Sequence, residues 1–177
     1  MRTFIILAFL LLPHSALAID ATGRVFLDSN KNGLLNAGER GIAGVRVSNG
    51  LDVVTTNDEG RYTLPVDEQS IIFITKPRDY AIPVNAHMLP QFYYIHQPAG
   101  SPAGMRYEGI APTGPLPEQI DFPLIERQES AQFEAILFAD PQPQTQRELD
   151  YIRDDVVAEL IDTQAAFGMT LGDILYD

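Results

Sequence analysis

The chain of 177 residues contains no cysteine, and it has only 12 Lys plus Arg against 24 Asp plus Glu. Without cysteine there is no disulfide, thiolate metal site or cysteine nucleophile, so any metal must be held by oxygen atoms or by histidine. The net charge of −12 leaves no cluster of cations for a phosphate backbone, which argues against a nucleic-acid partner. The hydrophobic fraction of 45% is ordinary for a globular protein and argues against disorder throughout the chain.

Long apolar runs are also scarce, and the longest one lies at the N-terminus. Residues 4–13 are almost continuously apolar and follow the positive Arg2, and Ala16 and Ala18 have the small-x-small spacing of a cleavage site. A membrane span needs about 20 apolar residues, which this run does not reach. We therefore predict that residues 1–18 are a signal peptide. The protein is then exported, periplasmic or secreted, with no membrane span after signal removal.

The region that follows has the pattern of short β-strands. Tyr62, Leu64 and Val66 alternate with more polar residues, which is the period of a half-buried strand, and residues 57–60 form a good turn before it. The other strand-like stretches are Arg24–Leu27, Val45–Ser48, Val53–Thr56 and Ile71–Thr75. Strands at this spacing indicate a mainly β protein whose N-terminal β-sandwich domain spans residues 19–127.

Proline concentrates in the second half of this predicted domain. Residues 77–123 contain nine of the thirteen prolines, so we expect this segment to be extended, looped or edge-like. Its aromatic residues should pack on the sandwich. His87 and His96 have no ligand-like neighbour at a useful spacing, so we interpret both as surface or packing residues.

Residues 131–177 change to an α/β pattern. Residues 135–139 form a continuous apolar run, typical of a parallel strand covered on both faces. Thr145 and Glu148 have the spacing of a capping box, and apolar residues then recur at helical spacing. A second apolar stretch, residues 167–171, follows. The order predicts a βαβ unit with two neighbouring parallel strands.

Each of these predicted strands ends near an aspartate, Asp140 and Asp173. Ligands bind beyond the carboxyl ends of parallel strands, and neighbouring strands lie about 4.8 Å apart, so the two carboxylates can converge on one cation. Gln142 can present an amide oxygen to the same place, and Gly172 permits close backbone approach. The alternative is that both aspartates only cap turns.

These residues resemble a known family. Asp140-Pro-Gln142 and Gly172-Asp173 followed by Asp177 look like the first two motifs of the calcineurin-like metallophosphoesterases, Asp-x-His and Gly-Asp-x-x-x-Asp. The resemblance implies hydrolysis of phosphate esters with divalent metal ions of the Mn, Mg or Fe/Zn class. It also implies that Asp140 and Gln142 bind one metal, that Asp173 bridges two, and that Asp177 supports the site without binding metal.

The upstream half resembles the N-terminal β-domain that a subset of these enzymes carries. The segments that resemble this domain are Phe92–His96, Pro112–Gly114 and Asp121–Leu124. Two departures from the family matter. Gln142 replaces a histidine, which favours manganese or magnesium over zinc or iron. The family's later histidine motifs do not occur, so we expect the truncated N-terminal portion of a phosphoesterase, inactive by itself.

A second metal-binding pattern lies near the N-terminus. The spacing D-x-N-x-N-G-x5-E is that of a calcium loop, with oxygen ligands from Asp28, Asn30, Asn32, the Leu34 carbonyl, Asn36 and Glu39. The flanking segments read as strands, so the context resembles the B-repeat-like β-sandwich modules of bacterial adhesins. The alternative is a polar turn that holds no ion.

Three functions therefore stay open from the sequence. The first is the N-terminal part of an exported phosphoesterase. The second is a secreted calcium-binding β-sandwich module for surface attachment or spacing. The third is a carbohydrate-binding sandwich, which only the aromatic residues of the proline-rich segment favour.

Overall fold

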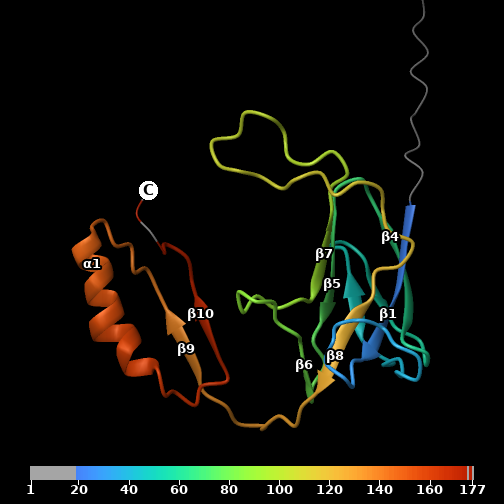
Figure 1. Cartoon of the computed structure of the whole chain (residues 1–177), viewed down its shortest axis with the longest axis horizontal. Coiled ribbons are helices and arrows are strands. Elements are labelled where there is room, and N and C mark those ends of the chain that lie inside the picture. Colours follow the sequence, from blue (N-terminus) through green and yellow to red (C-terminus); the bar gives the residue numbers. More distant parts are fainter. Residues whose placement is uncertain (1–18, 175, 177) are drawn as a thin grey trace, which may run out of the picture. The chain divides into compact units, whose positions relative to one another are not determined.

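The computed structural model describes residues 19–174 and 176, and the chain divides into two compact units (Figure 1). The N-terminal unit ends at Gln128 and the C-terminal unit begins at Glu129. The fold is mainly β, with an N-terminal β-domain followed by a small α/β segment, as the sequence predicts.

The N-terminal unit consists of two four-stranded sheets. Its strands are β1 (Ile19–Leu27), β2 (Arg46–Ser48), β3 (Val53–Thr55), β4 (Arg61–Val66), β5 (Ser70–Thr75), β6 (Tyr80–Ala81), β7 (Tyr93–His96) and β8 (Phe122–Glu126). One sheet has the order β4-β1-β8-β6 and the other β3-β2-β5-β7. All pairings are antiparallel except that of β1 with β8.

The predicted alternation in β4 is confirmed. Tyr62, Leu64 and Val66 are buried, whereas the residues between them are exposed. They join a core to which strands of both sheets contribute, with Val25 from β1, Ile72 from β5 and Leu124 from β8. Because each sheet covers the inner face of the other, this unit completes its own hydrophobic core.

The predicted turn before β4 is present, and it brings the backbone of Gly60 close to that of Val25 in β1. The N–H of Gly60 donates to the carbonyl of Asn57 at 2.8 Å, and the carbonyl of Gly60 accepts from Val25 N–H at 2.8 Å. Gly60 has a φ of +77°, and a Cβ at this position would lie 2.3 Å from the Val25 carbonyl oxygen. Glycine is therefore required here both for conformation and for space.

The proline-rich segment only partly matches its expected form. Residues 97–121 contain no strand, but Pro123 lies within β8, which is flanked by β1 and β6 and is not an edge strand. The pairing of β6 with β8 is limited to Glu126 and Ile125, so Pro123 lies beyond the end of β6. A proline is tolerated because no ladder bond with β6 reaches that position.

The C-terminal unit contains β9 (Ala135–Phe138), a helical run and β10 (Phe167–Thr170). The strands pair in parallel, from Ala135 opposite Phe167 to Phe138 opposite Thr170, as the βαβ prediction requires. The helical run comprises α1 (Gln146–Tyr151), a π-helical segment (Ile152–Val157) and a 3₁₀ turn (Ala158–Leu160). Thr145 and Glu148 form the predicted capping box at its start.

The prediction that the first strand of this unit is covered on both faces is wrong. Leu137 is 61% exposed, Phe138 is only half-buried, and every residue of β10 is exposed. The helical run also contains no buried residue. Two strands and one helical run provide no second covering layer, so apolar side chains stay in contact with solvent.

None of the helices in residues 19–174 and 176 has the length and apolar content needed to cross a lipid bilayer. The predicted signal peptide, residues 1–18, lies outside the described residues.

Candidate metal sites

The first candidate site lies beyond the carboxyl ends of β9 and β10. Parallel pairing continues past the strands, because the N–H of Leu171 donates to the Phe138 carbonyl at 2.9 Å. Farther along, the N–H of Gln142 donates to the carbonyl of Asp173 at 2.9 Å. The two segments that carry the predicted ligands Asp140, Gln142 and Asp173 are therefore adjacent in space.

The backbone at these three residues has an unusual conformation. Asp140, Gln142 and Asp173 have φ values of +51°, +27° and +49°. Non-glycine residues rarely adopt positive φ, at a cost of about 1–3 kcal/mol each, and such residues concentrate at functional sites. Half of the six described non-glycine residues with positive φ are the predicted metal ligands.

The donor set at this site consists of oxygen atoms. Asp140 and Asp173 are exposed and Gln142 is half-buried, so their side chains are accessible from solvent. Asp177, predicted to support the site, lies outside the described residues. Two carboxylates and one amide suit a hard cation such as Mg²⁺ or Mn²⁺, but they are fewer ligands than either ion requires.

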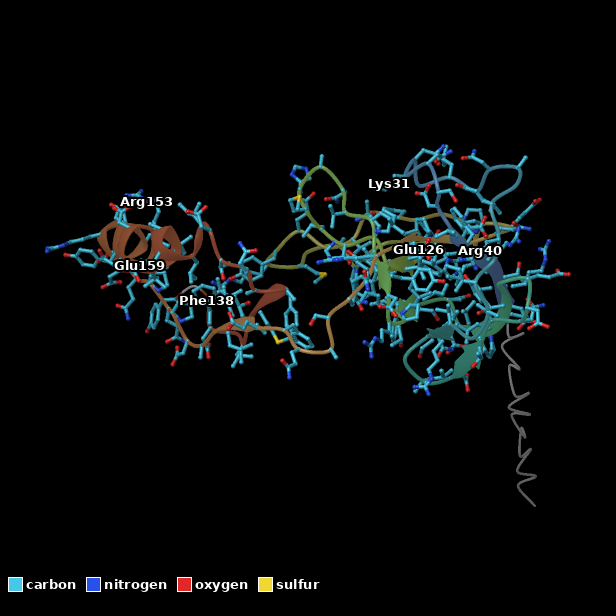
Figure 2. The ribbon with its side chains drawn as sticks, turned by 90° about the horizontal axis from the view of Figure 1, so that it is seen from below. Lys31, Arg40, Glu126, Phe138, Arg153 and Glu159 are labelled. Carbon is cyan, nitrogen blue, oxygen red and sulfur yellow. The ribbon has the colours of Figure 1, made fainter. Side chains whose placement is uncertain are left out.

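The second candidate site is the loop from Asp28 to Glu39, which follows β1. The Asp28 side chain is 1% exposed, and its two carboxylate oxygens accept from Asn32 N–H at 3.1 Å and Gly33 N–H at 2.8 Å. A buried carboxylate is expensive unless it is paired, and here two backbone donors from its own loop satisfy it. Lys31 lies on this loop (Figure 2).

Glu39 closes the loop from its other end. Its carboxylate oxygens accept from Ser29 N–H and Asn36 N–H, both at 2.9 Å. The base of the loop is held together by a hydrogen bond from Leu27 N–H to the Arg40 carbonyl at 2.9 Å. The first and last residues of the predicted calcium motif therefore lie within one closed, hydrogen-bonded loop.

The amide side chains of the loop converge on one point. The Oδ1 atom of Asn36 accepts from Nδ2 of Asn30 at 2.8 Å and from Nδ2 of Asn32 at 2.9 Å. The N–H of Leu34 donates to Asn32 Oδ1 at 2.8 Å. Binding of a cation here would require the amides of Asn30 and Asn32 to turn an oxygen toward the ion in place of their NH₂ groups.

Carboxylates alone do not complete either site. Within residues 19–174 and 176, no three His, Cys, Asp or Glu side chains are grouped so that they could hold a metal ion. His87 is exposed and His96 is buried in β7, in keeping with their interpretation as surface and packing residues. Among the described residues, any further ligand at either site is therefore an amide or backbone oxygen atom.

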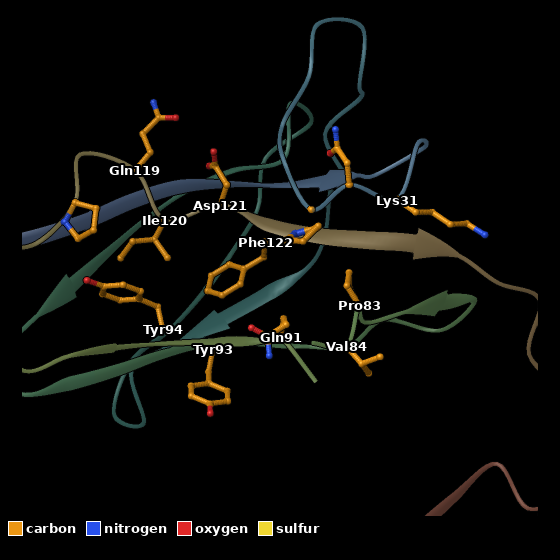
Figure 3. A pocket seen from close by; sticks show the side chains of 14 residues that line it. Lys31, Pro83, Val84, Gln91, Tyr93, Tyr94, Gln119, Ile120, Asp121 and Phe122 are labelled. Carbon is orange, nitrogen blue, oxygen red and sulfur yellow. The ribbon is translucent and has the colours of Figure 1, made fainter. Parts of the chain in front are cut away.

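The sequence does not predict a pocket on the N-terminal unit that has a volume of about 540 Å³ (Figure 3). Its lining comes from the 28–39 loop, the segment before β7, β7 itself, and the segment that leads into β8 together with the start of β8. These segments are far apart along the chain, and no short motif joins them, so no sequence pattern could have revealed the pocket.

Comparisons with known proteins find one family model similar to part of the N-terminal unit. Residues 29–109 match the family model described as the N terminal of calcineurin-like phosphoesterase, which covers a little under half of the chain. No curated protein matches the sequence. Among solved structures, the major plantain pollen allergen Pla l 1 shares 17% sequence identity at a TM-score of 0.36, over 63% of this chain and 95% of that chain.

The matched region includes most of the candidate calcium loop and the strands from β2 to β7, and it ends before Asp140. It agrees with the family that the motifs Asp140-Pro-Gln142 and Gly172-Asp173 resemble. Residues 29–109 are thus similar to the N-terminal region of calcineurin-like phosphoesterases.

Proposed function

We propose that this chain provides the β-domain and the first metal-ligand segments of an exported, metal-dependent phosphoesterase that hydrolyses phosphate esters. The observation that carries the proposal is the hydrogen bond from Gln142 N–H to the Asp173 carbonyl at 2.9 Å. It places the two phosphoesterase-like motifs next to each other, although 31 positions separate Gln142 from Asp173 along the chain.

The chemistry of the three residues supports this role. If the carboxylates of Asp140 and Asp173 converge, they repel each other, and a divalent cation between them removes the repulsion. Gln142 adds a neutral oxygen donor. A divalent ion bound there would supply a Lewis acid for a phosphoryl oxygen. Asp140 and Gln142 would hold one ion, and Asp173 would be shared with a second.

The chain by itself is expected to be inactive. Hydrolysis of a phosphate ester requires a retained metal and a positioned water molecule, and three oxygen ligands secure neither. The open faces of β9 and β10 also indicate that further polypeptide is needed to cover this unit. We therefore expect weak, millimolar metal binding and no measurable turnover.

The proposal is tested by titrating the ¹⁵N-labelled chain with Mn²⁺, whose unpaired electrons broaden NMR signals of nearby nuclei. Broadening is expected first at Asp140, Gln142 and Asp173, and Asp173→Asn should abolish it there. Asp155→Asn, which removes an exposed carboxylate from the π-helical segment, is the matched control and should leave the pattern unchanged. Preferential broadening at other acidic residues would contradict the proposed site.

A second function is favoured by the closed geometry of the 28–39 loop. We infer that this loop binds Ca²⁺ and stabilises the N-terminal unit, as expected of a secreted β-sandwich module for attachment or spacing. The buried Asp28 and the two hydrogen bonds accepted by Glu39 already fix the ends of the loop. With Asp28 and Glu39 as its only carboxylates, the loop should bind at micromolar or weaker affinity.

Thermal unfolding with and without calcium tests this function. At a calcium concentration 100 times the dissociation constant, binding should stabilise the folded state by about 2.7 kcal/mol. Glu39→Gln should lose that gain, whereas Glu68→Gln, in the turn between β4 and β5, should keep it. If calcium leaves the melting temperature of the unmodified chain unchanged, the loop is only a polar turn.

A further inference from the structure

We propose that the pocket beside β7 binds a neutral saccharide. The pocket lies entirely within the N-terminal unit, so the proposal does not depend on the phosphoesterase function. Its volume of about 540 Å³ is typical of small-molecule sites, which are about 300–1,000 Å³. It adds a ligand to a unit whose candidate calcium loop explains none of its aromatic residues.

The pocket combines an apolar surface with polar side chains. Figure 3 shows Tyr94 of β7 on one side. Ile120, which precedes β8, and Phe122, the first residue of β8, face it. Gln119 lies near one end of this group and Lys31 near the other (Figure 3). An aromatic face with hydrogen-bonding groups around it suits a pyranose ring, which has apolar C–H faces and hydroxyl groups on its rim.

Several polar groups of the pocket are available to a ligand. Within residues 19–174 and 176, the structure gives no hydrogen-bond partner to the Tyr94 hydroxyl, the Gln119 amide or the Lys31 ammonium group. Gln91 uses its Nε2 atom for the Leu89 carbonyl at 2.8 Å, and its Oε1 atom is left as an acceptor. Both donors and acceptors are therefore present, which matches hydroxyl groups, since each hydroxyl can do both.

The charges of the pocket favour a neutral ligand. Lys31 supplies one positive charge and Asp121 one negative charge, and Asp121 already accepts from Arg24 N–H at 2.7 Å. A phosphate or carboxylate ligand would need several converging cations, and the lining has only Lys31. A neutral polyhydroxylated molecule makes use of the amide and phenol groups without an unpaired charge.

NMR titration of the ¹⁵N-labelled chain with maltose, cellobiose and chitobiose tests the proposal. Saturable shifts are expected at residues 31–33, 91–94 and 119–122 with at least one of these disaccharides, with a millimolar dissociation constant. Tyr94→Ala should weaken binding about tenfold by loss of stacking and of one hydrogen bond. Tyr107→Ala, an exposed tyrosine outside the pocket, should not change it.

A second variant distinguishes loss of binding from a folding defect caused by Tyr94→Ala. Gln119 is exposed and outside the core, so Gln119→Ala should weaken binding several-fold while the melting temperature stays the same. Inorganic phosphate serves as the charged comparison and should produce no saturable shift in the pocket. If none of the disaccharides shifts pocket residues, or if phosphate does so instead, the proposal is wrong.

Discussion

The two units of this chain contain similar apolar stretches but differ in how they bury them. All core residues of the described chain belong to the N-terminal unit, where two sheets face each other. In the C-terminal unit, Pro143 is the only buried residue among those described, and Phe133 and Ile161 are 65% and 78% exposed. An apolar strand is therefore no guarantee of a core, because burial needs a second layer.

The difference has a functional consequence. The N-terminal unit can stabilise a loop or a pocket, because its core fixes the strands from which they emerge. The C-terminal unit brings the backbone of Gln142 next to that of Asp173 but supports these segments with a single pair of strands. A metal site requires rigid support around its ligands, so this unit should bind metal weakly until more polypeptide covers it.

The largest expected effect is that of substituting Gly60, which lies in the turn before β4 of the N-terminal unit. Gly60→Ala places a Cβ 2.3 Å from the Val25 carbonyl oxygen at a φ of +77°, so we expect a loss of about 3–5 kcal/mol in the free energy of unfolding. Urea denaturation monitored by circular dichroism measures this loss.

Substitution of two other glycines separates the effect of backbone crowding from the effect of positive φ. Gly44 has nearly the same φ, +76°, with open space around it, so Gly44→Ala should cost only about 1 kcal/mol. Gly168 in β10 has no neighbour closer than 3.8 Å, so Gly168→Ala should be nearly neutral. Equal losses for Gly60→Ala and Gly44→Ala would show that backbone crowding at the turn is unimportant.

A smaller effect is expected at high pH, again only in the N-terminal unit. Tyr62 is buried and donates its hydroxyl to the Ile120 carbonyl at 2.6 Å. Burial, and then the negative charge of Asp121, raise the pKa of the Tyr62 hydroxyl well above its ordinary value of 10.0.

The sign of the pH effect follows from this shift. The unfolded chain releases the Tyr62 proton from about pH 10, whereas the folded chain retains it, so stability falls above pH 10 by about 1.4 kcal/mol per pH unit. Urea denaturation at pH 8 and pH 11 measures the slope. Tyr62→Phe should be less stable at pH 8 by about 1–3 kcal/mol, because the Ile120 carbonyl loses its donor, but its stability should fall less steeply. An equal slope in both proteins would contradict the assignment to Tyr62.

The smallest expected effect concerns the helical run of the C-terminal unit. Thr145→Ala removes the side-chain acceptor for Glu148 N–H, and loss of such a cap costs about 1 kcal/mol. We expect reduced helical circular dichroism with no change in the calcium response of the N-terminal unit. Thr145→Ser retains the acceptor and should behave as the unmodified chain.

Local patterns in the sequence predict much of this structure. The alternation around Leu64, the turn at Gly60 and the capping box at Thr145 involve neighbours in sequence, and all three are confirmed. The parallel pairing of β9 with β10 was also predictable, because a strand-helix-strand order permits few arrangements.

Features that depend on distant partners could not be predicted. The parallel pairing of β1 with β8 joins residues about a hundred positions apart, and it brings Pro123 into an interior strand. The exposure of Leu137 depends on a covering layer that the strand's own sequence cannot reveal. The pocket near Tyr94 depends on four separate segments for the same reason.

Hydrogen exchange of backbone amides over the whole chain tests the contrast between the two units most directly. Amides in β1, β4 and β8 should exchange only through global unfolding, whereas those of β9 and β10 should exchange at least about 100-fold faster through local opening. Equal protection of β1 and β9 would contradict the account, because the C-terminal unit would then be a stably packed domain by itself.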